Sequence, residues 1–166
     1  NANDKPVITS GSTATVSENL PISNVVYTAT ASDADAGSNL IYSITGIDSY
    51  LMSIDADDGQ VRLKKSADFE TKNSYIFNVV VTDDGIGNLT STKEINLGIS
   101  NANDAPIISN PVKDIFVKEG NKKVINFNKV FSDPDDDLLT LSAKLLMGKD
   151  LPSWLKFNAL TNELTV

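Results

Sequence analysis

The sequence predicts an all-β protein with two β-sandwich units in tandem. Apolar and polar residues alternate over short segments bounded by Asp, Asn and Gly, which is typical of strands with one buried face. No segment carries the apolar stripe of an amphipathic helix. The string at residues 1–4 recurs at residues 101–104, each time followed by one residue, Pro and two apolar residues, which indicates a repeat boundary.

Short strands are expected throughout the first hundred residues. The clearest alternation is at residues 74–82, where Tyr75, Phe77, Val79 and Val81 share one face. Several short strands in a unit of this length predict a Greek-key sandwich, with a barrel as the alternative. The expected strands are residues 7–10, 13–16, 25–31, 40–44, 52–55, 61–64, 74–82 and 93–99.

The second unit repeats landmarks of the first. We place the first domain at residues 1–104 and the second at residues 105–166. Counterparts of residues 74–82 and 93–99 are missing from the second, so we expect a truncated sandwich with exposed sheet edges. The matching pairs are residues 16–19 with 117–120, 31–35 with 131–135, and 53–63 with 156–166.

Composition excludes several classes of function. The chain has 22 acidic and 14 basic residues, and this net charge of −8 disfavours nucleic acid and anionic lipid as partners. No apolar run is long enough to insert into a membrane. The chain has no His, no Cys and no Gly-rich phosphate loop, so we do not expect an enzyme. Carboxylate, amide and carbonyl oxygens remain as metal ligands, which favours hard cations.

Acidic residues recur at the expected turns of the first unit. The two acids of an Asp-x-Asp string place their carboxylates on one side of an extended segment. Calcium takes six to eight oxygens at about 2.3–2.6 Å, so several such groups must converge to bind it. Acidic residues and Gly are also common in turns without a metal, so each group alone is weak evidence. The groups are Glu18, residues 33–39, residues 68–70 and residues 83–85.

In combination, these groups make residues 1–106 resemble a cadherin repeat. The resemblance implies an immunoglobulin-like, seven-stranded Greek-key sandwich with Ca²⁺ bound between successive repeats. It therefore also implies neighbouring cadherin-like repeats as partners. Five motifs carry it, in the order of the family: Glu18-Asn19, residues 33–39, Asp68-Phe69-Glu70, Asp83, and the linker at residues 101–106.

The second unit resembles a dystroglycan-type cadherin-like domain. The residues that carry this resemblance are 131–139 and the Leu-Pro-Ser-Trp-Leu string at residues 151–155, followed by residues 156 and 157. Such a pairing is similar to those in large bacterial cell-surface or secreted proteins. The resemblance therefore implies an extracellular location.

The resemblance implies two groups of calcium ligands. In the linker, Asn101 stands where the family has Asp, and Ala105 stands where it has Asn, so we expect one or two junction ions rather than three. The implied junction ligands are Glu18, Asp68, Glu70, Asn101, Asn103, Asp104, Asp133 and Asp135. A weaker N-terminal site is implied at Asn3, Asp4, Asp33, Asp35, Asn39 and Asp83.

The leading functional hypothesis is a calcium-dependent adhesion module or a calcium-rigidified spacer, with a homophilic or cell-surface partner. An alternative is a polysaccharide-binding module of a secreted carbohydrate-active protein. That alternative needs exposed aromatic rings, and we expect Trp154, the only Trp, to be in the core or partly buried. A third hypothesis is self-association through the edges of the incomplete second unit.

Overall fold

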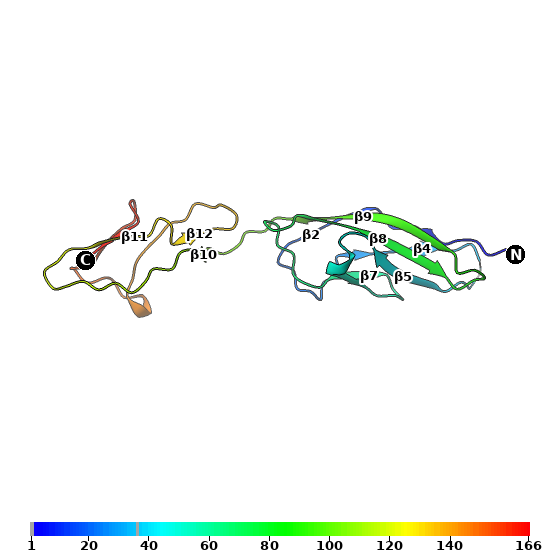
Figure 1. Cartoon of the computed structure of the whole chain (residues 1–166), viewed down its shortest axis with the longest axis horizontal. Coiled ribbons are helices and arrows are strands. Elements are labelled where there is room, and N and C mark those ends of the chain that lie inside the picture. The colour runs from blue at the N-terminus through cyan, green and yellow to red at the C-terminus, as the bar shows by residue number, and fades with distance from the viewer. Residues whose placement is uncertain (1, 36) are drawn as a thin grey trace. The chain divides into compact units, whose positions relative to one another are not determined.

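The computed structural model describes residues 2–35 and 37–166. Asn1 and Ala36, which belong to two of the motifs above, lie outside the described residues. The described residues form β-strands and two short 3₁₀ segments, and none of their helices is long and apolar enough to cross a membrane. The chain divides into two compact units, unit 1 at Asn1–Ala102 and unit 2 at Asn103–Val166 (Figure 1).

The described residues of unit 1 form nine strands in three sheets. One sheet has the order β2-β9-β8-β5, in which β2 runs parallel to β9 and the other pairs are antiparallel. A second sheet has the order β3-β7-β6, and β1 pairs with β4. The strands are β1 Val7–Ile8, β2 Thr13–Ser17, β3 Tyr27–Thr28, β4 Ala31–Ser32, β5 Leu40–Thr45, β6 Met52–Ile54, β7 Gln60–Leu63, β8 Ser74–Asp83 and β9 Thr90–Ser100, with the 3₁₀ segment η1 at Ser49–Leu51.

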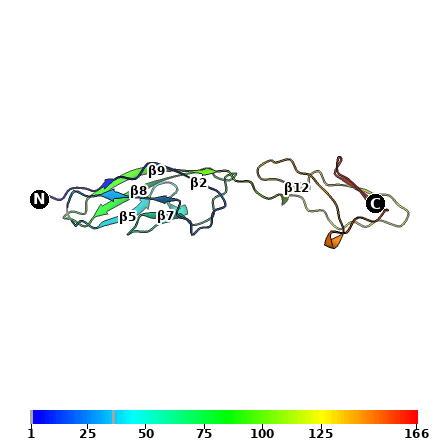
Figure 2. The same cartoon turned by 180° about the vertical axis from the view of Figure 1, so that it is seen from behind.

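Alternation along the strands builds the core of unit 1. Strand β8 buries every second residue, including Phe77 at 0% exposure. Figure 2 shows the strands β8 and β9 beside β7, which belongs to the three-stranded sheet. The Tyr27 ring meets the Phe77 ring edge-on, with centroids 6.0 Å apart. Two sheets packed face to face confirm the predicted sandwich and not the barrel alternative. The core also includes Met52, Val61, Leu63, Val79, Val81, Ile95, Leu97 and Ile99.

The expected strand at residues 25–31 is divided into β3 and β4. Ala29 N donates to Gly59 O at 2.9 Å, whereas Thr9 N donates to Thr30 O at 2.8 Å. The chain therefore changes pairing partner between Ala29 and Thr30, from β7 to β1. Gly59 makes this crossing possible, because its φ is +70° and a Cβ there would lie 2.4 Å from Ala29 O.

Unit 2 repeats the first strand pair of unit 1 at an offset of one hundred residues. Strand β10 pairs with β12 in the register Ile107↔Ser132, which matches Val7↔Ser32 in unit 1. A separate sheet has the order β11-β14-β13. The elements are β10 Ile107–Ile108, β11 Val124–Asn126, β12 Phe131–Ser132, η2 Leu146–Gly148, β13 Lys156–Asn158 and β14 Glu163–Thr165.

Unit 2 buries little apolar surface. Val130 is the only buried hydrophobic residue among those described in this unit. The expectation for Trp154 is wrong, because its side chain is 66% exposed. The physical reason is that the small sheets of unit 2 provide no packed layer over this side chain. Other exposed apolar residues are Phe116, Leu138, Leu146, Met147 and Leu160.

Candidate metal-binding sites

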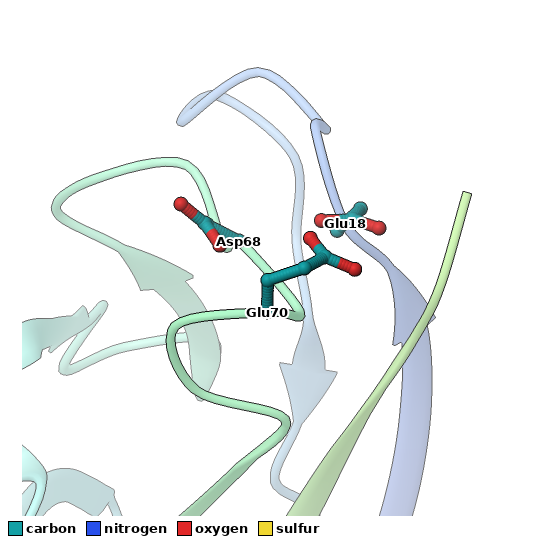
Figure 3. Close-up of side chains that lie close together, drawn as sticks. All are labelled: Glu18, Asp68 and Glu70. Carbon is teal, nitrogen blue, oxygen red and sulfur yellow. The ribbon is translucent and has the colours of Figure 1, made fainter. Parts of the chain in front are cut away.

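Three carboxylates converge in unit 1. Glu18 directly follows β2, and Asp68 and Glu70 lie in the loop before β8 (Figure 3). Each offers an oxygen that lies within 4.8 Å of the oxygens of the other two. We call these residues the carboxylate triad.

The buried member of the triad is fixed by the backbone. Glu18 is 2% exposed, and its Oε2 accepts a hydrogen bond from Phe69 N at 2.7 Å. Its Oε1 accepts one from Ala102 N at 2.8 Å. Glu18 therefore holds the loop before β8 and the segment after β9 together. Each of its oxygens keeps lone-pair capacity for a further partner.

The triad fits a calcium ion in spacing and in chemistry. Two oxygens on opposite sides of one calcium ion are separated by about 5 Å, so a 4.8 Å limit is compatible with a shared ion. The ligands are oxygens alone, which suit hard cations. Three carboxylates at this separation repel one another until a cation neutralises part of their charge.

Two further hydrogen bonds hold the exposed members of the triad. Asp68 Oδ1 accepts a hydrogen bond from Thr71 N at 2.9 Å. Asn101 Nδ2 donates to Glu70 Oε1 at 3.3 Å. Asn101, a predicted ligand, therefore lies beside the triad, with its amide group on Glu70.

A second group forms at the other end of β8. Asp83 is 1% exposed, and both of its oxygens accept hydrogen bonds from Asn3 Nδ2 at 3.2 Å. Its Oδ1 also accepts Gly85 N at 3.0 Å and Leu89 N at 3.1 Å. Asn39 is tied to the same end of the unit through its backbone N–H, which donates to Asp84 Oδ1 at 2.8 Å. The sequence motif contained Asp84, but the prediction did not select it.

The Asp-x-Asp string of unit 1 leaves one buried oxygen without a partner. Asp35 Oδ2 accepts Asp4 N at 2.7 Å, and Asp33 Oδ1 accepts Asp35 N at 2.8 Å. Asp33 Oδ2 is buried and has no hydrogen-bond partner within the described ranges. An unsatisfied buried carboxylate oxygen is costly, and a cation would satisfy it.

Unit 2 reproduces this arrangement. Asp135 Oδ2 accepts Asp104 N at 2.6 Å, and Asp133 Oδ1 accepts Asp135 N at 3.0 Å. Here Asp135 Oδ1 is the buried oxygen that has no hydrogen-bond partner in the described part of the chain. Asn103 Nδ2 donates to the carbonyl of Asp104 at 3.1 Å. The string in each unit therefore leaves one buried carboxylate oxygen unsatisfied, on its first Asp (Asp33) in unit 1 and on its second (Asp135) in unit 2.

The predicted ligands thus fall into three groups, two in unit 1 and one in unit 2. The participation of all eight predicted junction residues in one site stays a prediction. The backbone donors Phe69 N and Ala102 N were not predicted, because no side-chain motif marks them. The groups are Glu18, Asp68, Glu70 and Asn101; Asn3, Asp4, Asp33, Asp35, Asn39 and Asp83; and Asn103, Asp104, Asp133 and Asp135.

Solved cadherin structures share this fold. The EC1-2 segment of human protocadherin-24 matches with a TM-score of 0.63 at 18% identity, over 99% of this chain and 78% of that one. The EC3-6 segment of protocadherin gammaB7, described as a cis-dimer structure, matches with a TM-score of 0.61 at 21% identity, over 98% of this chain and 43% of that one. The EC22-24 segment of mouse cadherin-23 matches with a TM-score of 0.58 at 22% identity, over 98% of this chain and 53% of that one.

The solved structures establish the fold of this chain, and the family model establishes its family. The chain spans only 43% and 29% of the protocadherin gammaB7 and gammaB4 chains, so it corresponds to a part of those proteins. The sequence identities to these three structures are below 25%, so the structural similarity establishes the fold alone. The family model named "Cadherin domain" matches residues 12–100, which is more than half of the sequence. The chain therefore belongs to the cadherin family, with its cadherin domain in unit 1.

Proposed function

We propose that this chain is a calcium-binding module of an extracellular protein, which serves calcium-dependent adhesion or acts as a calcium-rigidified spacer. Cadherin domains in general are extracellular adhesion modules that bind calcium. The observation that carries the proposal for this chain is the carboxylate triad, with Glu18 buried and pinned by two backbone N–H groups. A bacterial surface or secreted parent protein and a dystroglycan-type second unit belong to the same proposal.

The proposal assigns a role to each group of residues. The triad and Asn101 would hold calcium at one end of unit 1, and Asp33 would supply an oxygen at the other end. In unit 2, Asp135 would supply an oxygen from the corresponding string. The prediction that the triad and the unit 2 ligands share a junction site is part of the proposal, and so is the expected number of one or two ions.

Calcium would stabilise the folded chain by linkage. Extracellular calcium modules bind with dissociation constants of about 10⁻⁴–10⁻³ M. At a free calcium concentration about 100 times the dissociation constant, binding to the folded state alone stabilises it by about 2.7 kcal/mol. Removal of calcium would restore the repulsion among the three carboxylates of the triad. Rigidity in calcium would let successive repeats hold a distant binding surface away from the cell.

Thermal unfolding and calorimetric titration test this proposal. The chain is measured with calcium, with magnesium and with a chelator, as the parent and as Glu70→Gln. We expect a calcium-specific rise in the melting temperature, which Glu70→Gln reduces. Glu94→Gln is the matched control, because Glu94 is exposed on β9 and lies outside the triad. Equal melting temperatures in calcium, magnesium and chelator would refute the proposal.

Polysaccharide binding is a second candidate, because Trp154 is 66% exposed. An exposed indole ring can stack on a sugar ring. Pull-down on insoluble polysaccharides, with and without calcium, tests this candidate. Trp154→Ala should abolish retention, whereas the exposed apolar control Leu160→Ala should not change it. No retention of the parent chain on any polysaccharide would exclude this function.

A further inference from the structure

Unit 1 has a groove lined by apolar side chains, three lysines and one acidic residue, Asp68. The groove has a volume of about 240 Å³, and the side chains of Leu63 and Tyr75 lie in its lining. Lys64, Lys65 and Lys72 also line it, and we call these three residues the lysine rim. These are three of only six basic residues at positions 1–102, against thirteen acidic ones. A basic groove on a unit of this charge favours a partner segment with an acidic group and an apolar side chain.

Two of the three lysines in the groove make contacts within unit 1. Lys72 Nζ lies 3.2 Å from Asp48 Oδ1 and 5.2 Å from the centre of the Tyr75 ring. Lys64 Nζ donates to Tyr50 O at 3.0 Å. The Lys65 ammonium has neither an ion pair nor a hydrogen bond in the described part of the chain. A preformed groove with one uncommitted charge on its rim can take an anionic partner without rearrangement.

A segment with the matching chemistry lies on the β8–β9 hairpin of the same unit. Ile86, at its tip, is 94% exposed, which is the highest value among the large apolar side chains described in unit 1. Asp84 lies two residues before it and is also exposed. Two hydrogen bonds order the tip: Asn88 N donates to Gly85 O at 3.0 Å, and Asp83 Oδ1 accepts Gly85 N at 3.0 Å. The hairpin thus presents an apolar side chain beside a carboxylate.

The tip cannot enter the groove of its own unit. Tyr75, in the groove, and Asp83, at the base of the tip, lie eight residues apart on one continuous strand, β8. At about 3.3 Å per residue, this separation is roughly 26 Å. We propose that the Ile86 tip of one copy binds in the Lys65 groove of a second copy, with Asp84 beside the lysine rim.

Calcium binding at the carboxylate triad would strengthen this contact between copies. This coupling rests on the proposed function. Asp68 belongs both to the carboxylate triad and to the groove lining. Without a cation, the triad places three negative charges beside the groove and opposes an acidic partner. A bound calcium ion neutralises two of these charges, so the groove attracts Asp84 more strongly. Self-association should therefore be stronger in calcium than in chelator.

Sedimentation velocity over a series of protein concentrations tests the contact. We expect the parent chain to associate in calcium, and we expect Ile86→Ser and Lys65→Glu each to raise the dissociation constant about tenfold or more, as the loss of a central anchor does. Ile22→Ser and Lys122→Glu are the controls: they make the same chemical changes at other exposed positions and should leave association unchanged. Adding Asp84→Lys to Lys65→Glu should restore association through the reversed charge pair.

The outcomes separate this inference from the proposed function. A parent chain that is monomeric in calcium at all concentrations would overturn the groove contact, even where calorimetry shows calcium binding. Association that neither Ile86→Ser nor Lys65→Glu weakens, for example through the edges of unit 2, would also overturn it. Asp68→Asn removes one repelling charge, so its association should depend less on calcium than that of the parent. An unchanged calcium dependence in Asp68→Asn would refute the coupling alone.

Discussion

Asn101 limits the charge of the carboxylate triad. Its Nδ2 donates to Glu70 Oε1 at 3.3 Å, so a neutral amide occupies an oxygen that a cation would otherwise use. An Asp at this position would add a negative charge and remove that donor. We predict that Asn101→Asp raises calcium affinity about tenfold, equivalent to about 1.4 kcal/mol, and lowers the melting temperature in chelator.

Calorimetry and calcium-free melting measure these two effects. Asn101→Ala is the control, because it removes the amide without adding a charge, and it should not reproduce the tenfold gain in calcium affinity. The interpretation of Asn101 would be wrong if Asn101→Asp bound calcium no more tightly than the parent.

The buried phenol of Tyr75 makes the stability of the folded chain depend on pH in the alkaline range. Burial raises the pKa of Tyr75 above its usual value of 10.0, Lys72 opposes this shift, and Asp48 and Asp68 add to it. The folded chain therefore keeps the phenol proton at a pH where the unfolded chain has lost it. The stability from this group is complete below about pH 10 and decreases as the pH rises toward the folded-state pKa.

Tyr75→Phe removes this source of alkaline destabilisation. We predict that the free energy of unfolding from urea titrations falls less between about pH 9 and about pH 11 in Tyr75→Phe than in the parent. Tyr42→Phe, at a half-buried position on β5, serves as the control and should follow the parent. Equal decreases in parent and Tyr75→Phe would show that Tyr75 does not contribute to the pH dependence.

At the level of elements, the sequence predicted the strands whose apolar and polar residues alternate. Strands β8 and β9 were found from their alternating apolar residues, because each strand has one buried face. The division of residues 25–31 into β3 and β4 was not found, because it depends on hydrogen bonds to Gly59 and Thr9, which are distant in sequence. The candidate site was likewise predicted only in its side-chain motifs, and not in the contacts that folding creates between distant residues. Carboxylate motifs identified the triad, whereas the backbone donor Ala102 N becomes visible only in the folded chain.

The crossing at Gly59 is a sensitive point of the sandwich. Gly59→Ala would place a Cβ 2.4 Å from Ala29 O at a φ of +70°. Because backbone cannot move aside cheaply, we predict a loss of about 2–4 kcal/mol in the free energy of unfolding. Gly37→Ala is the matched control: its φ is +87°, and a Cβ there has no atom within 4 Å. It should cost about 1 kcal/mol. Urea unfolding followed by circular dichroism measures both, and similar losses would contradict the steric argument.

At the level of the whole molecule, the two units differ in how much apolar surface they bury. Unit 1 has a continuous core that includes Phe77 and Ile95 at 0% exposure, whereas Val130 is the only buried hydrophobic residue described in unit 2. Apolar burial is the main favourable term in folding. The two units should therefore open with different free energies, and a single melting temperature would not describe the chain.

Hydrogen exchange measures this difference directly. We predict that amides of β11, β13 and β14 exchange about a hundredfold faster, or more, than those of β8 and β9, because a strand without a packed core opens locally. Trp154 provides a second readout, since a side chain that is 66% exposed should emit as a solvated indole before and after unit 1 unfolds. Comparable protection in both units, or a blue-shifted Trp154 emission, would show that unit 2 acquires a packed core in solution.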